Sequence, residues 1–277
     1  MSETLPTDFA SLADQIAGWL RFQMEQVGAS RLVLGLSGGI DSAVVCALST
    51  MAAGPSRVIA AIMPIHSRPE DMRDAELVAT TFEVVPRVID LVPAQDALMA
   101  AMPPDDAAGL EDANVDPARQ TTRRQLAVAN VKPRLRMTSL YFLANRYNGL
   151  VVGTGNKTEL AIGYFTKYGD GGVDVPPLGD LDKTAVRGLA HALGVPEPVI
   201  SKAPSAGLWE GQTDEAEIGV TYDELDRVLA SFASGEIEEP LHSDTMDRIS
   251  GLITASEHKR RAIPMFRRDT VDVFPSQ

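Results

Sequence analysis

A glycine- and serine-rich segment near the start of the chain contains residue types suited to binding phosphate. It lies between an apolar run and an amphipathic stretch and reads Gly35, Leu36, Ser37, Gly38, Gly39, Ile40, Asp41, Ser42. Two adjacent glycines allow a tight turn, and successive backbone N–H groups then point to one spot at the start of a helix, where phosphate binds well. A carboxylate repels phosphate, so Asp41 indicates a Mg²⁺ ion between itself and a pyrophosphate.

Other interpretations of residues 35–42 are open at this point. Residues 35–39 also fit the G-x-S-x-G pattern of hydrolases, in which Ser37 would be an acyl nucleophile. That pattern normally follows a strand deep in the sheet, whereas here it follows the first strand. The segment could also be an ordinary glycine-rich turn. It is not a Walker A loop, because no lysine follows the glycines.

A second polar segment, residues 153–159, follows another apolar run. Glu159 is its only acid and the first after a stretch, residues 117–158, that contains no Asp or Glu. Ligands of open α/β sheets bind at the carboxyl ends of the strands, where both segments would lie. Glu159 is therefore a candidate second Mg²⁺ ligand beside Asp41. The alternative interpretation is a glutamate that caps a helix.

Further segments combine aromatic, glycine and basic residues. Residues 163–174 place aromatic side chains beside a glycine-rich turn, and Lys167 among them could meet a phosphate or carboxylate. Residues 205–222 contain Trp209, with Gly207 and Gly211 on either side of it, and are typical of a mobile lid. A basic group follows near the C-terminus, at residues 257–261. Positive charge gathered in this way favours a small polyanionic ligand.

The elements that must position these residues alternate between apolar runs and amphipathic stretches. Strands are predicted at residues 31–36, 58–63, 84–91 and 150–153, the third weakened by Pro86. Helices are predicted at residues 8–28, 42–53, 69–82, on both sides of 130–133, and at 182–193, 222–231 and 243–259, with a mobile loop at 103–118. This order indicates an α/β fold with a doubly wound parallel sheet and a helical C-terminal part. Because no linker is evident, we expect a single domain over residues 1–277.

Composition excludes several classes of function. The 277 residues include 25 Lys and Arg against 38 Asp and Glu, a net charge of −13, which argues against a nucleic-acid-binding protein. No apolar run approaches the roughly 18 residues of a membrane span. The single cysteine, Cys46, excludes an internal disulfide and a cysteine-rich zinc site. With no secretory signal at its start, the chain is expected to be cytoplasmic.

The motifs together resemble a known enzyme family. Residues 35–42 resemble the pyrophosphatase loop of the ATP pyrophosphatase superfamily, whose members split ATP between its α and β phosphates to adenylate a substrate. From residue 35 to about residue 266 the chain resembles the NAD synthetase family, through the motifs S-G-G-I-D-S, G-N-K-T-E, G-Y-F-T-K-Y-G-D-G-G, P-S-A-G-L-W-E-G-Q-T-D-E and S-E-H-K-R. The resemblance implies a Rossmann-like fold of the adenine nucleotide alpha hydrolase type.

The resemblance also implies a reaction and its participants. Family members convert deamido-NAD to NAD: the nicotinate carboxylate attacks the α-phosphate of ATP, pyrophosphate leaves, and ammonia then displaces AMP from the acyl adenylate. Mg²⁺ is the implied metal and a homodimer the implied assembly, with deamido-NAD at the interface. Some relatives carry a glutaminase domain with a nucleophilic cysteine. Only about 30 residues precede the first strand here, so we expect no glutaminase domain, free ammonia as the nitrogen source, and Cys46 in the core.

Carried over position by position, the resemblance implies three groups of site residues. The ATP site comprises Gly35 through Ser42, Thr154, Lys183 and Ser205. Asp41 and Glu159 hold Mg²⁺, and Asp41 and Lys183 are the catalytic residues. Deamido-NAD is bound by Arg134, Lys167, Asp174, His258 and Lys259. The residues after Pro64, where adenine would lie, match less clearly and receive no role.

Three other functions compete with this interpretation. The chain could be another adenylating enzyme of the superfamily, such as a tRNA-thiolating one, although the net charge and the lack of cysteine pairs oppose this. It could be a non-catalytic nucleotide-binding protein, although both Asp41 and Glu159 are present. The Ser37 hydrolase is the third.

Overall fold

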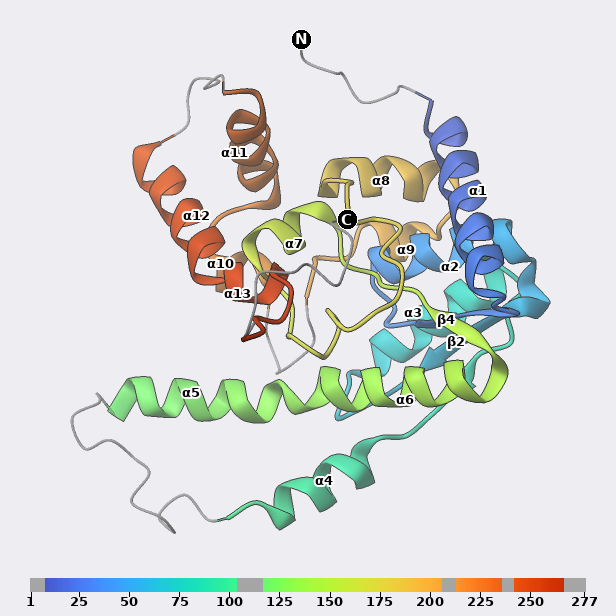
Figure 1. Cartoon of the computed structure of the whole chain (residues 1–277), viewed down its shortest axis with the longest axis horizontal. Helices are drawn as coiled ribbons and strands as arrows, with labels where there is room; N and C mark the ends of the chain where they lie inside the picture. Colours follow the sequence, from blue (N-terminus) through green and yellow to red (C-terminus); the bar gives the residue numbers. More distant parts are fainter. Residues whose placement is uncertain (1–7, 104–116, 206–212, 236–241, 267–277) are drawn as a thin grey trace.

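A four-stranded parallel sheet forms the centre of the molecule (Figure 1). The computed structural model describes residues 8–103, 117–205, 213–235 and 242–266. The strands are β1 (Arg31–Gly35), β2 (Val58–Ile62), β3 (Arg87–Val88) and β4 (Gly149–Val151), in the spatial order β3-β2-β1-β4. The register pairs Gly35 with Ala61 and Val33 with Val151. Because β1 lies between β2 and β4, the segments that follow these three strands meet at one edge.

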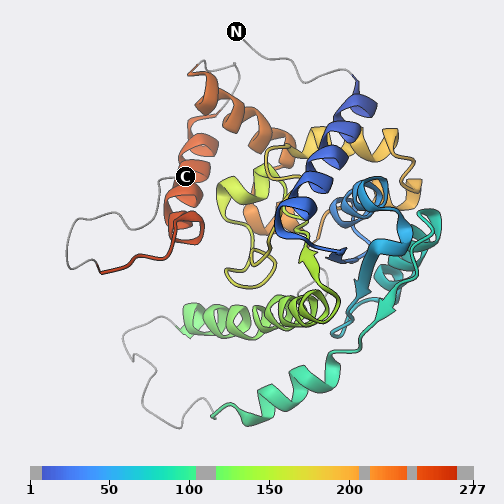
Figure 2. The same ribbon diagram turned by 45° about the vertical axis from the view of Figure 1, so that its right-hand side comes forward.

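Helices cover both faces of the sheet, as predicted for a doubly wound fold (Figure 2). Leu32 and Leu34 join the core formed with α1 (Phe9–Val27), α2 (Ile40–Ala53), α3 (Pro69–Thr81) and α8 (Lys183–Ala192). The intervening Val33 faces a second core that includes Leu143 and Ala144 of α6 (Val131–Tyr147). This alternation follows from the two-residue period of a strand, and it buries both faces of β1.

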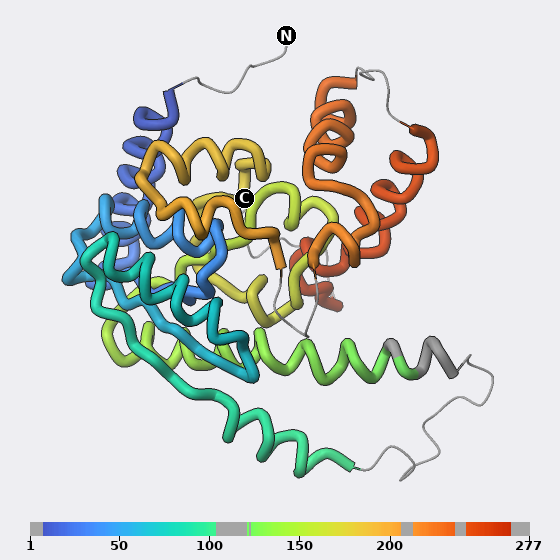
Figure 3. The backbone as a smooth tube through the Cα atoms, turned by 180° about the vertical axis from the view of Figure 1, so that it is seen from behind, coloured from blue at the N-terminus to red at the C-terminus, as the bar shows by residue number. Residues whose placement is uncertain are grey.

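A separate helical core lies beside the sheet (Figure 3). Tyr222 and Leu225 of α11 (Tyr222–Ser234) pack there with Ile249 of α12 (Ser243–Ala255). The same core receives Ile162 of α7 (Lys157–Ile162) and Ile218 of α10 (Asp214–Ile218). Since α7 directly follows the β4 segment, this helical part is attached to the carboxyl edge of the sheet. The remaining helices are α4 (Val92–Ala101), α5 (Pro117–Ala129), α9 (Glu197–Ile200), α13 (Glu257–Arg260) and the short 3-10 helix η1 (Pro55–Arg57).

Most predicted elements are present, and the differences have local causes. Asp8 caps α1 as predicted, its carboxylate accepting from the N–H groups of the first turn. The third strand is limited to Arg87–Val88, so the prediction of residues 84–91 was too long: Pro86 lacks an N–H, and the N–H of Val84 donates to Ala79 at the end of α3. Helix α4 was not predicted. The predicted helix 243–259 divides at Ser256.

One general expectation, the burial of Cys46 in the core of α2, is confirmed. Among the described residues, no helix has the length and apolar character required to cross a bilayer.

Candidate functional site

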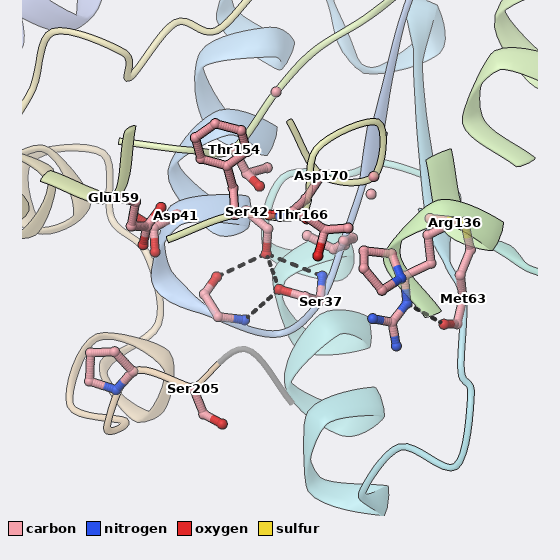
Figure 4. A pocket seen from close by; sticks show the side chains of 18 of the residues that line it. Ser37, Asp41, Ser42, Met63, Arg136, Thr154, Glu159, Thr166, Asp170 and Ser205 are labelled. Atoms are coloured by element: carbon pink, nitrogen blue, oxygen red, sulfur yellow. Dashed lines mark hydrogen bonds between the residues drawn. The ribbon is translucent and has the colours of Figure 1, made fainter. Parts of the chain in front are cut away.

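A cavity of about 510 Å³ opens at the carboxyl ends of β1, β2 and β4 (Figure 4). Its floor is the segment of residues 35–42, which joins β1 to α2 and which we call the phosphate-binding loop after its predicted role. One wall comes from the segment after β2 and from α6, and the opposite wall from the segments around Thr154 and Lys183. Segments far apart in the sequence thus share one site, as expected for an open α/β sheet.

Hydrogen bonds between its two serines hold the phosphate-binding loop in shape. The hydroxyls of Ser37 and Ser42 lie 3.0 Å apart, and that of Ser42 donates to the carbonyl of Gly39 at 2.9 Å. The N–H of Gly39 donates to Ser37 Oγ at 3.2 Å. Gly38 has φ +81°, and a Cβ there would lie 2.3 Å from the carbonyl oxygen of Asp71 in α3. Glycine is therefore required for both the backbone conformation and the close approach of the helix.

The charged centre of the site consists of Asp41, Lys183 and Glu159. The ammonium of Lys183 lies 2.6 Å from Asp41 Oδ2 and 3.5 Å from Glu159 Oε1, and its side chain is only 1% exposed. The amide of Asn156 donates to Asp41 Oδ1 at 3.0 Å, and the N–H of Asn156 donates to Glu159 Oε2 at 3.2 Å. Figure 4 shows Asp41 and Glu159 side by side at one end of the cavity.

Electrostatics at this centre are dominated by acids. Burial and the nearby Asp41 raise the pKa of Glu159 to about 7, against the opposing effect of Lys183. Burial lowers the pKa of Lys183, but Asp41 and Glu159 outweigh it, so the pKa lies above its ordinary value. The hydroxyl of Tyr222 lies 3.3 Å from Glu159 and 3.1 Å from Asp214, which brings a third carboxylate to the group. Three carboxylates facing one ammonium favour an additional cation.

Asp41 and Glu159 fit the way in which proteins usually coordinate Mg²⁺ together with a nucleotide. Among the residues described, no three His, Cys, Asp or Glu side chains are arranged to hold a metal ion. Mg²⁺ usually binds through one or two carboxylates together with substrate phosphates and water, rather than in an all-protein cage. Asp41 and Glu159 are two such carboxylates beside a phosphate-binding loop, and their role as metal ligands stays a prediction.

The residues predicted for ATP lie together. Of the phosphate-binding loop all but Gly38 line the cavity, and so do Thr154, Lys183 and Ser205. Gly38 is turned toward α3 instead, as its contact with Asp71 requires. Ser205 is at the edge of the cavity in Figure 4.

The residues predicted for deamido-NAD lie mostly outside this cavity. Only Lys259 lines it, and its ammonium donates to the carbonyls of Gly163 at 2.6 Å and Phe165 at 2.7 Å. Three of the others adjoin one another: Arg134 donates to the Lys167 carbonyl at 3.4 Å, and Lys167 donates to the His258 carbonyl at 2.8 Å.

Asp174, the fifth of these residues, is held by hydrogen bonds near the end of β4. Its carboxylate accepts from the hydroxyl of Tyr141 at 2.9 Å and from the N–H of Val151 at 2.7 Å. The five residues therefore do not form one contiguous lining of the cavity.

A second charged group, not predicted from the sequence, lies in the cavity wall. Lys202 contacts Asp71 at 2.8 Å and Asp74 at 2.5 Å, and Arg68 donates to Asp71 through two nitrogens. Partial burial raises the pKa of Asp71, but Arg68 and Lys202 lower it by more, so this pKa lies below its usual value. No periodicity connects these positions. Arg136, also missed, did carry a signal, because it lies in the acid-free stretch 117–158.

The remaining predictions about this region have mixed outcomes. Ser37 is hydrogen-bonded within its own loop, and no histidine of the described part of the chain hydrogen-bonds to it, so the hydrolase interpretation finds no catalytic partner here. Residues 206–212 of the predicted lid, Trp209 among them, lie outside the described residues, as do residues 104–116 of the predicted loop 103–118.

Comparison with known proteins gives one consistent family. Residues 12–263 match the NAD synthase family. An NH(3)-dependent NAD(+) synthetase from Carboxydothermus hydrogenoformans is 44% identical over 254 residues, which are 91% of this chain and 96% of that protein. The structure of an NMN synthetase from Francisella tularensis is 34% identical with a TM-score of 0.79, over 95% of this chain and 99% of the other.

A third relative is a longer protein, of which this chain matches about half. The glutamine-dependent NAD+ synthetase from Acinetobacter baumannii, solved in complex with adenosine diphosphate, is 27% identical with a TM-score of 0.64. The match covers 97% of this chain but 49% of that one. The match to the NH(3)-dependent relative, by contrast, runs over nearly its whole length.

Proposed function

We propose that this chain, which belongs to the NAD synthase family, amidates deamido-NAD to NAD with ATP and ammonia. The single observation that carries the proposal is the meeting of Asp41, Glu159 and Lys183 beside the phosphate-binding loop, in a chain that matches this family over residues 12–263. The reaction forms an acyl adenylate and releases pyrophosphate. Ammonia then attacks the acyl carbon, and AMP leaves with the bonding electrons.

ATP would lie along the cavity with its pyrophosphate on residues 35–42. The loop offers backbone N–H groups at the start of α2, where an anion is stabilised. The segment after β2 and the facing side of α6 line the other end of the cavity with apolar side chains, among them Met63, Met137 and Leu140. A flat adenine ring matches that surface. Thr154 and Ser205 would supply hydroxyls between the two ends.

Lys183 is the main protein group for the adenylation step. Its ammonium is fixed by Asp41 and Glu159 before substrate arrives, so little reorganisation is needed as charge develops on the leaving pyrophosphate. Mg²⁺ held by Asp41 and Glu159 would neutralise phosphate charge and make the pyrophosphate a better leaving group. Proximity of the nicotinate carboxylate to the α-phosphate would supply much of the remaining acceleration.

Deamido-NAD would bind through Arg134, Lys167, Asp174, His258 and Lys259. Four of these five residues lie outside the ATP cavity, which supports a dinucleotide site that extends beyond it. The cationic side chains of Arg134 and Lys167 suit the dinucleotide's phosphates. A homodimer with this site at its interface is part of the proposal, and so is a single domain that takes ammonia directly, like the NH(3)-dependent relatives.

A second candidate substrate is the mononucleotide, nicotinic acid mononucleotide. The observation in its favour is the 0.79 TM-score to a protein described as an NMN synthetase. Its amidation would need the same loop, metal and lysine, so the ATP cavity does not discriminate between the two substrates.

One assay tests the proposal. Purified protein is mixed with ATP, Mg²⁺ and ammonium, and deamido-NAD and the mononucleotide are supplied in separate reactions. We expect NAD, AMP and pyrophosphate in equal amounts from deamido-NAD, and slower turnover of the mononucleotide. Faster amidation of the mononucleotide would reassign the substrate, and absence of AMP with both would refute the adenylation.

A further inference from the structure

One cation of the cavity differs from all the others in its hydrogen bonds. The ammonium or guanidinium groups of Arg68, Lys183 and Lys202 contact carboxylates, and that of Lys259 contacts two backbone carbonyls. Arg136 makes a single hydrogen bond, from Nε to the Met63 carbonyl at 3.1 Å. Its terminal guanidinium nitrogens have no hydrogen bond or ion pair within the described part of the chain.

The surroundings make this arrangement costly without a ligand. Arg136 lies in α6 and lines the cavity beside the apolar Met137 and Leu140. Burial lowers its pKa, although the charges of Asp170 and Asp71, with which it makes no ion pair in the described part of the chain, act in the opposite direction. A shielded cation without a paired anion loses hydration and gains little in return. A guanidinium has five N–H donors in a rigid fork, and four of them stay available here for an anionic oxygen.

The position of Arg136 indicates which anion it would meet. Gly35 of β1 is paired with Ala61 of β2. Ser37 and Met63 each lie two residues beyond this pair, so the segments that follow the two strands start next to each other. Figure 4 shows the Arg136 guanidinium at the Met63 side of Ser37. It thus lies between the loop that would hold the pyrophosphate and the apolar surface that would hold the adenine. In ATP, the α-phosphate stands between these two groups.

We propose that Arg136 is a catalytic residue that binds the α-phosphate of ATP, the phosphorus at which the acyl adenylate forms. This inference rests on the proposed function, because it assumes that a nucleotide occupies the cavity. The contact with Met63 aims the fork, and the free N–H groups bind the non-bridging oxygens as the carboxylate attacks and pyrophosphate leaves. Arg136 stays protonated throughout and transfers no proton.

Direct binding measurements separate this role from the alternatives. Calorimetry with the full chain would compare AMP, ATP, adenosine, pyrophosphate and deamido-NAD as ligands of the wild type, Arg136→Met and Arg136→Lys. We expect Arg136→Met to weaken AMP binding about 10- to 100-fold, the usual worth of a charged hydrogen bond. Adenosine and pyrophosphate affinities should change less than about twofold, since neither has an α-phosphate ester. Arg136→Lys should restore AMP binding only in part, because an ammonium lacks the fork.

Two controls distinguish loss of the Arg136–phosphate contact from a change in net charge and from loss of folding. Arg146→Met removes a cation from the exposed end of the same helix and should leave AMP affinity unchanged. The ligand-free Arg136→Met protein should melt at or above the wild-type temperature, because a shielded unpaired cation is gone, while its stabilisation by AMP shrinks.

The outcomes are distinguishable. Equal AMP affinity of wild type and Arg136→Met would overturn the assignment, as would a loss confined to adenosine or to deamido-NAD. Either result would leave the proposed function standing. If the wild type bound neither AMP nor ATP, the proposed function itself would fail.

Discussion

At the residue scale, the site depends on a buried lysine held between two carboxylates. Lys183 is among the largest fully buried side chains, and Asp41 is its nearest acidic partner at 2.6 Å. A buried cation is tolerated only when it is paired with an anion. The burial of Lys183 therefore requires Asp41 and Glu159 to lie beside it. The arrangement therefore positions two carboxylates beside the phosphate-binding loop before any ligand binds.

Asp41→Asn should abolish most activity. The change removes a proposed Mg²⁺ ligand and the strongest partner of Lys183, so we expect at least an about 100-fold loss of turnover, since several kcal/mol of charge stabilisation are involved. NAD formation and Mg²⁺-dependent stabilisation would be measured. Asp180→Asn is the matched control, since Asp180 is 95% exposed and pairs with Lys157 at the surface. Near-normal turnover of a folded Asp41→Asn protein would eliminate the metal role.

Cys46 should be inert in the native protein. Its burial raises the pKa of the thiol to about 12, so only about one molecule in 10⁴ is a thiolate at pH 8, and the thiolate is the reactive form. Iodoacetamide should label the native chain at least about 100-fold more slowly than the chain in denaturant. Mass spectrometry would follow the labelling. Rapid native labelling would show that α2 opens or that this thiol is accessible.

At the element scale, the phosphate-binding loop and α3 are in direct contact at Gly38. The carbonyl of Asp71 occupies the place where a side chain at residue 38 would begin. The Asp71 carboxylate also joins Arg68 to Lys202, three residues before Ser205. Helix α3 thus supports the loop on one side and fixes the approach to Ser205 on the other.

Gly38→Ala should damage stability and nucleotide binding together. Both Gly38 and Gly28 have positive φ, and an alanine there costs about 1–2 kcal/mol. At Gly38 the clash with Asp71 adds about 1–3 kcal/mol, whereas nothing lies within 4 Å of a Cβ at Gly28. Urea unfolding and ATP binding would be compared for both variants. We expect only Gly38→Ala to lose ATP affinity, and identical behaviour of the two would refute the proposed contact.

At the scale of the whole molecule, α5 and α6 present apolar side chains on the outside. Phe142 is 62% exposed, and Val128 and Tyr147 are also exposed on the same pair of helices. Figure 1 shows α5 and α6 end to end along one edge of the molecule. An exposed apolar surface of this kind is typical of a protein–protein interface, which agrees with the proposed homodimer.

Phe142→Glu should therefore weaken the dimer. Placing a charge in an apolar interface desolvates it without a partner, so we expect a shift to monomers at micromolar concentration in light scattering coupled to size exclusion. Phe232→Glu is the control, since Phe232 is 45% exposed on α11, away from α6. A monomeric wild type, or a dimer unaffected by Phe142→Glu, would contradict the interface.

Local features of this protein could be predicted from the sequence. Apolar runs identified the strands, Asp8 marked the start of α1, and the glycines of residues 35–42 marked the strand-to-helix turn. The motif resemblance connected Asp41, Glu159 and Lys183, which the structure brings together. The strands, the helix cap and the turn depend on residue type and near neighbours along the chain, so their physical cause is visible in the sequence, whereas the meeting of Asp41, Glu159 and Lys183 was expected only from the resemblance.

Most contacts between distant segments could not be predicted, because they depend on how the chain folds in three dimensions. The pairing of Lys202 with Asp71, the position of Tyr222 beside Glu159, and the open hydrogen-bonding positions of Arg136 have no periodic or local signature. Such contacts arise where the carboxyl ends of β1, β2 and β4 converge, because the order of strands in a sheet is set by packing and not by neighbours in the chain. This convergence decides which groups each side chain contacts and which of its hydrogen-bond donors remain available to a ligand.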